Sequence, residues 1–349
     1  MGNMASSTLV QRVEECPSED PCVALQPAIY DPLDTAKSET RICRILPSSP
    51  DRMTACELKR VSLENSPHYS CLSYAWGKHQ DTAQILLNDQ VVSVTANLSI
   101  ILERLRGHRQ NEWFWIDVIC INQADAQEKG QQVESMGRIY RQASEVFVWL
   151  GPEMMTFDGS RDPDVVAGAN DAVSDGSDAA EAIETLKSLA EGTHFHQLPC
   201  FGQCYSTSCQ SRTTKPSKSW QATKESLISL LEVPWFTRTW VVQEIVLARK
   251  AVLMHGEHSL QWDVLVAAWN NWDQHSQDCC ADCVATLSES EYTLLHRLRW
   301  QVQELERMRQ QEASDHSLLR LLLGFRNRKA TDSRDKIFGM LDSSLRSPC

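Results

Sequence analysis

The chain has 349 residues, enough to bury a substantial core, and its 42% hydrophobic content and 11 tryptophans are typical of a folded protein. The net charge is −12 and no segment is rich in lysine and arginine, which argues against nucleic-acid binding through phosphate neutralisation. No uncharged apolar run is long enough to span a bilayer, so no transmembrane segment is predicted.

No secretory signal is expected, because residues 1–10 lack a basic region followed by an apolar one. The 13 cysteines are therefore expected as free thiols in a reducing, cytoplasmic compartment. Residues 1–40 are rich in Pro, Ser, Asp and Glu without periodicity and are predicted to be a flexible leader. Residues 1–6 fit the loose pattern for myristoylation of Gly2; chance is the simpler explanation, and a single acyl chain would attach the protein to a membrane only weakly.

Apolar alternation predicts three strands in the first part of the chain, at 41–46, 55–61 and 70–76. Two apolar runs within 83–95 flank Asn88-Asp89 and predict a hairpin. Asn97 is the expected N-cap of a helix, and Gly107 is expected to stop that helix.

The segment 112–151 has the pattern strand, turn, helix, strand. Its first strand is expected at 113–119, where the residues are apolar on both faces, and its second at 146–150. Asp125 is the expected N-cap of the helix between them, with Glu128 in the capping-box position.

Residues 154–219 hold many Gly, Ser, Asp and Thr, with one short helical pattern near 179–190, and are predicted to be a partly disordered insertion. A strand is expected at 251–256. Helices are expected at about 221–232, 239–248, 262–272, 288–311, 316–325 and 333–342. The pattern predicts an α/β fold with a mostly parallel, mixed central sheet flanked by helices and a helical C-terminal portion, in one domain over 41–342 with a short tail at 343–349.

Polar residues collect where the 113–119 strand ends. Open α/β sheets bind ligands at the carboxyl ends of their strands, which makes Asp117, Asn122 and Gln123 candidate site residues. Asp117 either contacts a polar ligand or caps the turn that follows, and both interpretations stand. Glu128 is either a catalytic acid or only a capping residue.

Trp76 and Gly77 follow another predicted strand. The tryptophan can stack on a planar ligand or pack in the core, and the glycine allows close approach of a ligand. For Trp115, core packing is the expected role. Arg238 and Glu244 lie on the 239–248 helix or just before it, where they either reach a site or form a solvated helix face.

Two groups of cysteine and histidine have spacings that could bind zinc: His194, His196, Cys200, Cys204 and Cys209, and Cys279, Cys280 and Cys283. Neither group has paired CxxC knuckles, so free thiols are expected and no metal is assigned. The sequence also lacks GxSxG, GxxxxGK[ST] and a helix-opening GxGxxG, which removes the usual support for hydrolase, P-loop and Rossmann functions.

Four segments in order carry a resemblance to a known family: YSCLSYAWG at 69–77, WIDVICINQ at 115–123, PWFTRTWVVQEIVLA at 234–248 and ATDSRDKIFGML at 330–341. Together they resemble the fungal heterokaryon incompatibility (HET) domain over roughly 40–340. The resemblance implies a fungal allorecognition factor that triggers programmed cell death and acts with protein partners. The chain stops soon after the last segment, whereas many relatives continue into further modules.

HET domains are in turn similar to TIR domains, some of which hydrolyse NAD. This likeness implies an alternative function, in which a carboxylate stabilises the positive charge on the ribose while nicotinamide leaves. NAD is then a substrate, and no firm cofactor is expected. The family motif positions that this chain holds are Ser73, Tyr74, Trp76, Gly77, Trp115, Asp117, Cys120, Asn122, Gln123, Glu128, Arg238, Gln243 and Glu244. A non-enzymatic assembly module and an NAD-consuming enzyme both remain open.

Overall fold

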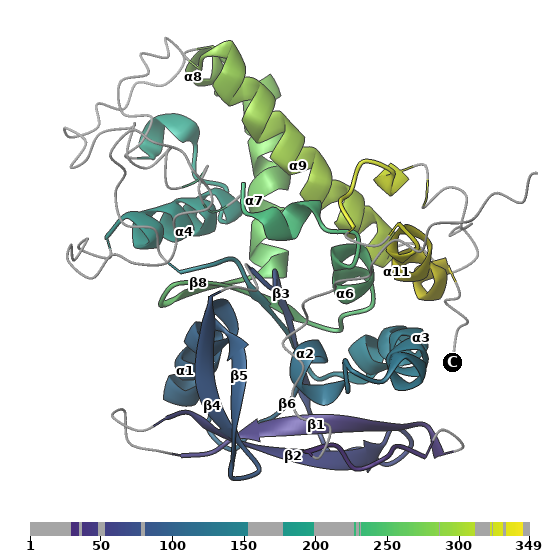
Figure 1. Ribbon diagram of the computed structural model, residues 1–349. Helices are drawn as coiled ribbons and strands as arrows, with labels where there is room; N and C mark the ends of the chain where they lie inside the picture. The colour runs from purple at the N-terminus through teal and green to yellow at the C-terminus, as the bar shows by residue number, and fades with distance from the viewer. Residues whose placement is uncertain are drawn as a thin grey trace, which may run out of the picture.

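A single mixed sheet organises the chain (Figure 1). The structure, a computed structural model, describes residues 29–34, 37–47, 53–77, 81–152, 177–198, 227, 230, 232–285, 287–310, 322, 324–330 and 333–344. Its nine strands are β1 (Glu39–Ile45), β2 (Ala55–Ser62), β3 (Ser70–Tyr74), β4 (Thr82–Leu87), β5 (Gln90–Thr95), β6 (Trp113–Trp115), β7 (Val146–Trp149), β8 (Ala251–His255) and β9 (His258–Gln261). They lie in the order β5-β4-β2-β1-β6-β3-β7-β8-β9.

The centre of the sheet is parallel. β6, β3, β7 and β8 run side by side in the same direction, while β1, β2, β5 and β9 supply antiparallel pairs around them. Every residue of β3, β7 and β8 is buried, as expected for strands covered on both faces. The predicted α/β class with a mixed sheet is confirmed.

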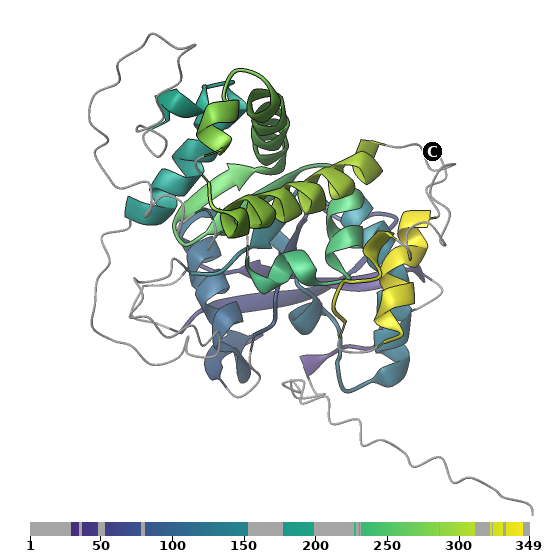
Figure 2. The same cartoon turned by 90° about the horizontal axis from the view of Figure 1, so that it is seen from above.

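Some helices cover the two faces of this sheet, and others lie above it in the view of Figure 1 (Figures 1 and 2). Their bounds are α1 (Ala96–His108), α2 (Asp117–Cys120), α3 (Ala126–Gln142), α4 (Ser177–Ala190), η3 (Phe195–Gln197), η5 (Pro234–Thr237), α6 (Val241–Val246), α7 (Trp262–Gln277), α8 (Ala281–Val284), α9 (Glu289–Gln310) and α11 (Asp335–Ser344). The long α9 packs on α6 and α7, and α11 lies beside both α6 and α3 although α3 is nearly 200 residues away in the chain.

The predicted strand at 113–119 is wrong in its second half. β6 ends at Trp115, and residues 117–120 form the short helix α2, in which the amides of Ile119 and Cys120 both donate to the Ile116 carbonyl at 3.0 and 2.7 Å. Val118, Ile119 and Cys120 are all buried. An apolar run of this length does not distinguish a buried strand from a buried helical turn, which is why the pattern misled.

The boundaries of α1 also differ from the prediction. Thr95, not Asn97, is the N-cap, since its side chain accepts the Leu98 amide, and Gly107 lies inside a helix that continues to His108. The Asn97 side chain instead joins two strand ends, because it donates to the Ala75 carbonyl at 2.7 Å and accepts from Trp149 Nε1 at 3.0 Å.

The hairpin at 83–95 is confirmed as β4 and β5. Asn88 and Asp89 at its turn have φ of +49° and +63°, the left-handed conformations of a type I′ turn. β9, which pairs with β8, was not predicted.

The helical pattern near 179–190 forms α4. Its buried face, made of Ala182, Ile183, Leu186 and Leu189, packs against α7. The rest of the predicted insertion lies almost entirely outside the described residues, as do residues 1–28 of the leader with Gly2, most of the tail, and most of the helices expected at 221–232 and 316–325. The last part of the predicted leader is described and packs on the fold: Ile29 and Tyr30 are buried, Tyr30 donates its hydroxyl to the Ile119 carbonyl at 3.0 Å, and β1 begins at Glu39. Within the described part of the chain, no helix is long and apolar enough to cross a membrane.

Candidate functional site

Asp117 lies where the sequence predicted a site, just past the carboxyl end of β6. Trp76, just past the end of the neighbouring β3, donates its indole Nε1 to Asp117 Oδ2 at 2.8 Å. The other carboxylate oxygen accepts the Val118 amide at 2.7 Å, so Asp117 also caps the turn that follows. Both Asp117 and Trp76 keep part of their surface exposed to solvent.

A second carboxylate, Glu244 on α6, lies deeper and is only 3% exposed. The hydroxyl of Ser73 on β3 donates to Glu244 Oε2 and accepts the indole N–H of Trp235 at 2.7 Å. Ser73 and Glu244 are 171 residues apart in the chain, so this contact joins the central sheet to α6. Trp235, in η5, was not among the predicted site residues.

Two arginines lie near these carboxylates and oppose the rise in their pKa values. Arg238, between η5 and α6, donates to the Tyr74 carbonyl and is partly exposed. Arg328 is 7% exposed and donates to the carbonyls of Phe236 and Arg238 at 2.8 and 3.1 Å. We name Asp117, Glu244, Arg238 and Arg328 the carboxylate cluster. Arg328 also went unpredicted, because it lies just outside the 330–341 motif.

The charges of the cluster shift the pKa values of its members. Burial raises the pKa of Glu244 above its ordinary value, against the opposing effects of Arg238 and the Ser73 hydrogen bond, and Asp117 raises it further. Burial likewise raises the pKa of Asp117, while Arg238 and the Trp76 hydrogen bond lower it. Burial lowers the pKa of Arg328 to about 10. Carboxylates whose pKa is raised towards neutrality can act as acid–base groups, and also occur in structural ion-pair networks.

Glu128, the other carboxylate candidate, belongs to a different set of contacts. Both of its oxygens are bound by the Arg41 guanidinium of β1, at 2.6 and 2.9 Å, and Oε1 also accepts the Asn122 amide at 2.8 Å. Arg41 further donates to the carbonyls of Cys120 and Asp31. Glu128 is 8% exposed, and its contacts with Arg41 connect β1 to the start of α3.

The capping box predicted at this helix start is half correct. Asp125 is the N-cap and accepts the amides of Gln127 and Glu128 at 2.9 and 3.0 Å. The reciprocal contact is absent, because the Asp125 amide donates to the Asn122 carbonyl and Glu128 turns instead to Arg41. The predicted strand 41–46 holds two arginines, and nothing in the sequence indicates that Arg41, rather than Arg44, is the buried one.

The remaining candidates divide between edge and core. Gln123 Nε2 donates to the Asp117 carbonyl at 3.1 Å, and its Oε1 is buried with no partner among the described residues. Gly77 is exposed with φ of +81°. Asn122 Oδ1 accepts the Ala124 amide, a local turn contact.

Trp115 is fully buried and donates to Thr40, so its predicted core role is confirmed. The structure brings Trp76, Asp117, Gln123 and Arg238 together at the carboxyl edge of the sheet.

Comparison with known proteins identifies the family of this chain. The family model described as heterokaryon incompatibility protein (HET) matches residues 69–244, from the start of β3 to Glu244 itself. The chain is 26% identical over 312 residues to heterokaryon incompatibility protein 6, OR allele, of Neurospora crassa; the match covers 82% of this chain and 44% of that relative. The chain thus spans less than half the length of the curated relative, and no solved structure matches it. Since the family match covers half of the chain, this chain belongs to the heterokaryon incompatibility family.

Proposed function

We propose that this chain acts in fungal heterokaryon incompatibility as a module that triggers death of the fusion cell. Family membership over 69–244 and the name of the Neurospora crassa relative support an incompatibility role. The observation that carries the proposal is the family match over 69–244, and the Ser73–Glu244 contact brings residues near the two ends of that segment together. Such a module would act in the cytoplasm through self-association or binding to other proteins.

A second function, hydrolysis of NAD, has support from the edge of the sheet. Asp117 is partly exposed and lies beside the aromatic Trp76. Burial raises its pKa, and the cationic Arg238 is close enough to oppose that rise. In the reaction, the bond between ribose C1′ and the nicotinamide nitrogen breaks and water adds to C1′, giving ADP-ribose, nicotinamide and a proton. An ionised Asp117 would stabilise the positive charge that develops on the ribose. Arg238 would bind a phosphate and Trp76 a planar ring.

On this geometry the preferred catalytic candidate is Asp117 rather than Glu128. Both oxygens of Glu128 are held by Arg41, so a substrate would have to displace a buried ion pair to reach them. Asp117 accepts one hydrogen bond on each oxygen and still faces solvent. Glu244 is too buried to contact a substrate without movement of α6, and its expected role is to position Ser73 and Arg238.

The test is induced expression in a fungal host, with NAD and viability followed over time for the wild type, Asp117→Asn and the exposed control Glu134→Gln. An early fall in NAD with the wild type and the control, but not with Asp117→Asn, supports the enzyme. Death with unchanged NAD supports an assembly-driven effector, for which surface substitutions away from the carboxylate cluster should abolish killing. A folded wild-type chain that neither kills nor lowers NAD contradicts both functions. Melting temperatures of the purified variants establish that each is folded.

A further inference from the structure

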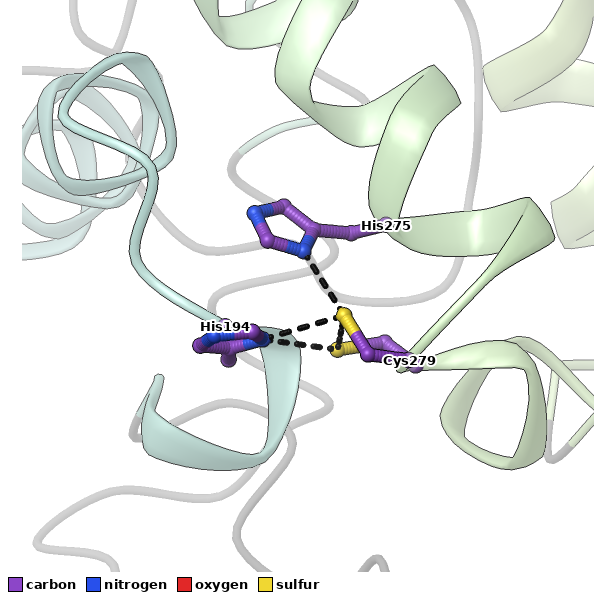
Figure 3. Close-up of side chains that lie close together, drawn as sticks. His194, His275 and Cys279 are labelled. Carbon is purple, nitrogen blue, oxygen red and sulfur yellow. Dashed lines mark hydrogen bonds between the residues drawn. The ribbon is translucent and has the colours of Figure 1, made fainter. Parts of the chain in front are cut away.

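A group of metal-binding side chains lies outside the carboxylate cluster, where η3 meets the end of α7 (Figure 3). His194 immediately precedes η3, His275 is in the last turn of α7, and Cys279 and Cys280 lie between α7 and α8. One ligand atom from each of the four residues lies within 4.8 Å of all the others. In Figure 3 the rings of His194 and His275 both point toward the Cys279 sulfur.

The distances have the scale of a tetrahedral zinc site. The Cys279 and Cys280 sulfurs are 3.7 Å apart, and the Cys280 sulfur is 3.7 Å from His194 Nδ1. Zinc bonds of about 2.3 Å to sulfur and 2.0 Å to nitrogen at tetrahedral angles place two sulfurs about 3.8 Å apart, and sulfur about 3.6 Å from nitrogen. The Cys279 sulfur is nearer to His194 and His275, at 3.1 and 3.0 Å, and would move outward by about 0.5 Å to admit the ion.

The geometry points to a structural zinc site formed by His194, His275, Cys279 and Cys280. Two thiolates and two imidazoles are a ligand set that favours zinc over magnesium or calcium. A thiol carries one proton, so Cys279 can donate to only one of the two imidazole nitrogens that face it. A central divalent cation engages all four atoms at once, after both thiol protons leave to solvent.

Contacts around the four residues are those that zinc ligands commonly have. His275 also hydrogen-bonds the backbone of Gly192, the kind of contact that orients a metal-bound imidazole. Burial raises the pKa of the Cys280 thiol to about 11, while the sulfur accepts backbone hydrogen bonds at Phe195 and His196, contacts of the kind that metal-bound sulfur receives. The ring of Phe195 stacks on Trp272 of α7 at 4.4 Å, so apolar packing already brings η3 to its place.

The proposed site departs from the expectation of free thiols and takes residues from both cysteine–histidine groups of the sequence. Cys200, Cys204 and Cys209 lie outside the described residues. Cys283 and His196 are buried nearby but are not in the ligand set. Four protein ligands leave no open position for substrate, so the ion would fasten the α4–η3 segment to α7 and α8 rather than take part in a reaction.

The test uses the full chain purified under reducing conditions without chelator, with zinc measured per chain by mass spectrometry. We expect about one zinc per chain in the wild type and in the matched controls Cys283→Ser and His196→Ala, and less than a tenth of that in Cys279→Ser and His275→Ala. Zinc content that is the same in all five proteins overturns the site.

Because a ligand variant can also lose metal by unfolding, the second arm uses the wild type alone. The chain is stripped with a chelator, checked for retained helix by circular dichroism, and titrated with Co²⁺. Absorption bands of tetrahedral cobalt bound by thiolate, saturating at one ion per chain and removed by zinc, support the site. A folded, fully reduced chain that shows no such bands overturns it, as does a Cys279–Cys280 disulfide found in the freshly purified protein.

Discussion

Removing the Glu128 carboxylate should destabilise the whole chain, whatever its effect on function. The Arg41 side chain is 2% exposed. In Glu128→Ala its guanidinium keeps its charge but loses the carboxylate to which it donates two hydrogen bonds. Breaking a buried ion pair by removing one member costs about 3–5 kcal/mol. For 349 residues the entropy of unfolding is about 0.7 kcal/mol/K, so the melting temperature should fall by about 4–7 °C.

The assay is thermal unfolding followed by circular dichroism, with Glu134→Ala as the matched control. Glu134 is on the same helix but exposed, so its removal should change stability by less than about 0.5 kcal/mol. The double variant Arg41→Met/Glu128→Leu should recover much of the loss, because apolar residues of similar size often replace a buried pair without cost. A Glu128→Ala chain that melts with the control refutes the structural role and returns Glu128 to the list of catalytic candidates.

Two further predictions concern the carboxylate cluster and the β4–β5 hairpin. Because burial raises the folded-state pKa of Glu244, the stability it contributes is present below its unfolded pKa of about 4.3 and is lost as the pH rises through the folded pKa. The melting temperature of the wild type relative to Glu244→Gln should therefore rise as the pH is lowered from neutral towards the unfolded pKa, and a constant difference contradicts the assignment. Asp89→Gly should raise the free energy of unfolding by about 0.5–1 kcal/mol in urea, since glycine suits φ of +63° in this turn; a decrease shows that the Asp89 side chain stabilises the hairpin.

Local patterns were sufficient to predict most of the fold. Alternation located β1 and β2, and period-3.6 spacing located α7 and α9. The prediction of a strand was wrong at α2 because Val118, Ile119 and Cys120 are all buried, and a buried strand and a buried helical turn have the same run of apolar residues. The candidate residues at the carboxyl edge were predictable because the end of a parallel strand is a general location for sites, and Asp117 lies there.

The partners of those residues were not predictable, because each comes from a distant part of the chain. Arg41 and Glu128 are 87 residues apart, and Ser73 and Glu244 are 171 apart. The proposed zinc ligands show the same limit. Sequence proximity grouped His194 with Cys200, whereas the fold places it against Cys279, 85 residues away. No local spacing encodes such pairs, since they depend on the order of strands and on how α4 packs against α7.

The side-chain contacts of each motif residue also determine whether its substitution can distinguish a loss of catalysis from a loss of stability. Glu128 and Glu244 are both buried and both hold separate segments together, so loss of killing in their alanine variants would not distinguish a missing catalyst from an unfolded chain. Trp76, Asp117 and Arg238 are partly exposed and lie at the carboxyl edge of the sheet. Loss of killing at an unchanged melting temperature is informative at these three positions, which is why Asp117→Asn, rather than a change at Glu128, is the variant that tests the proposed enzyme.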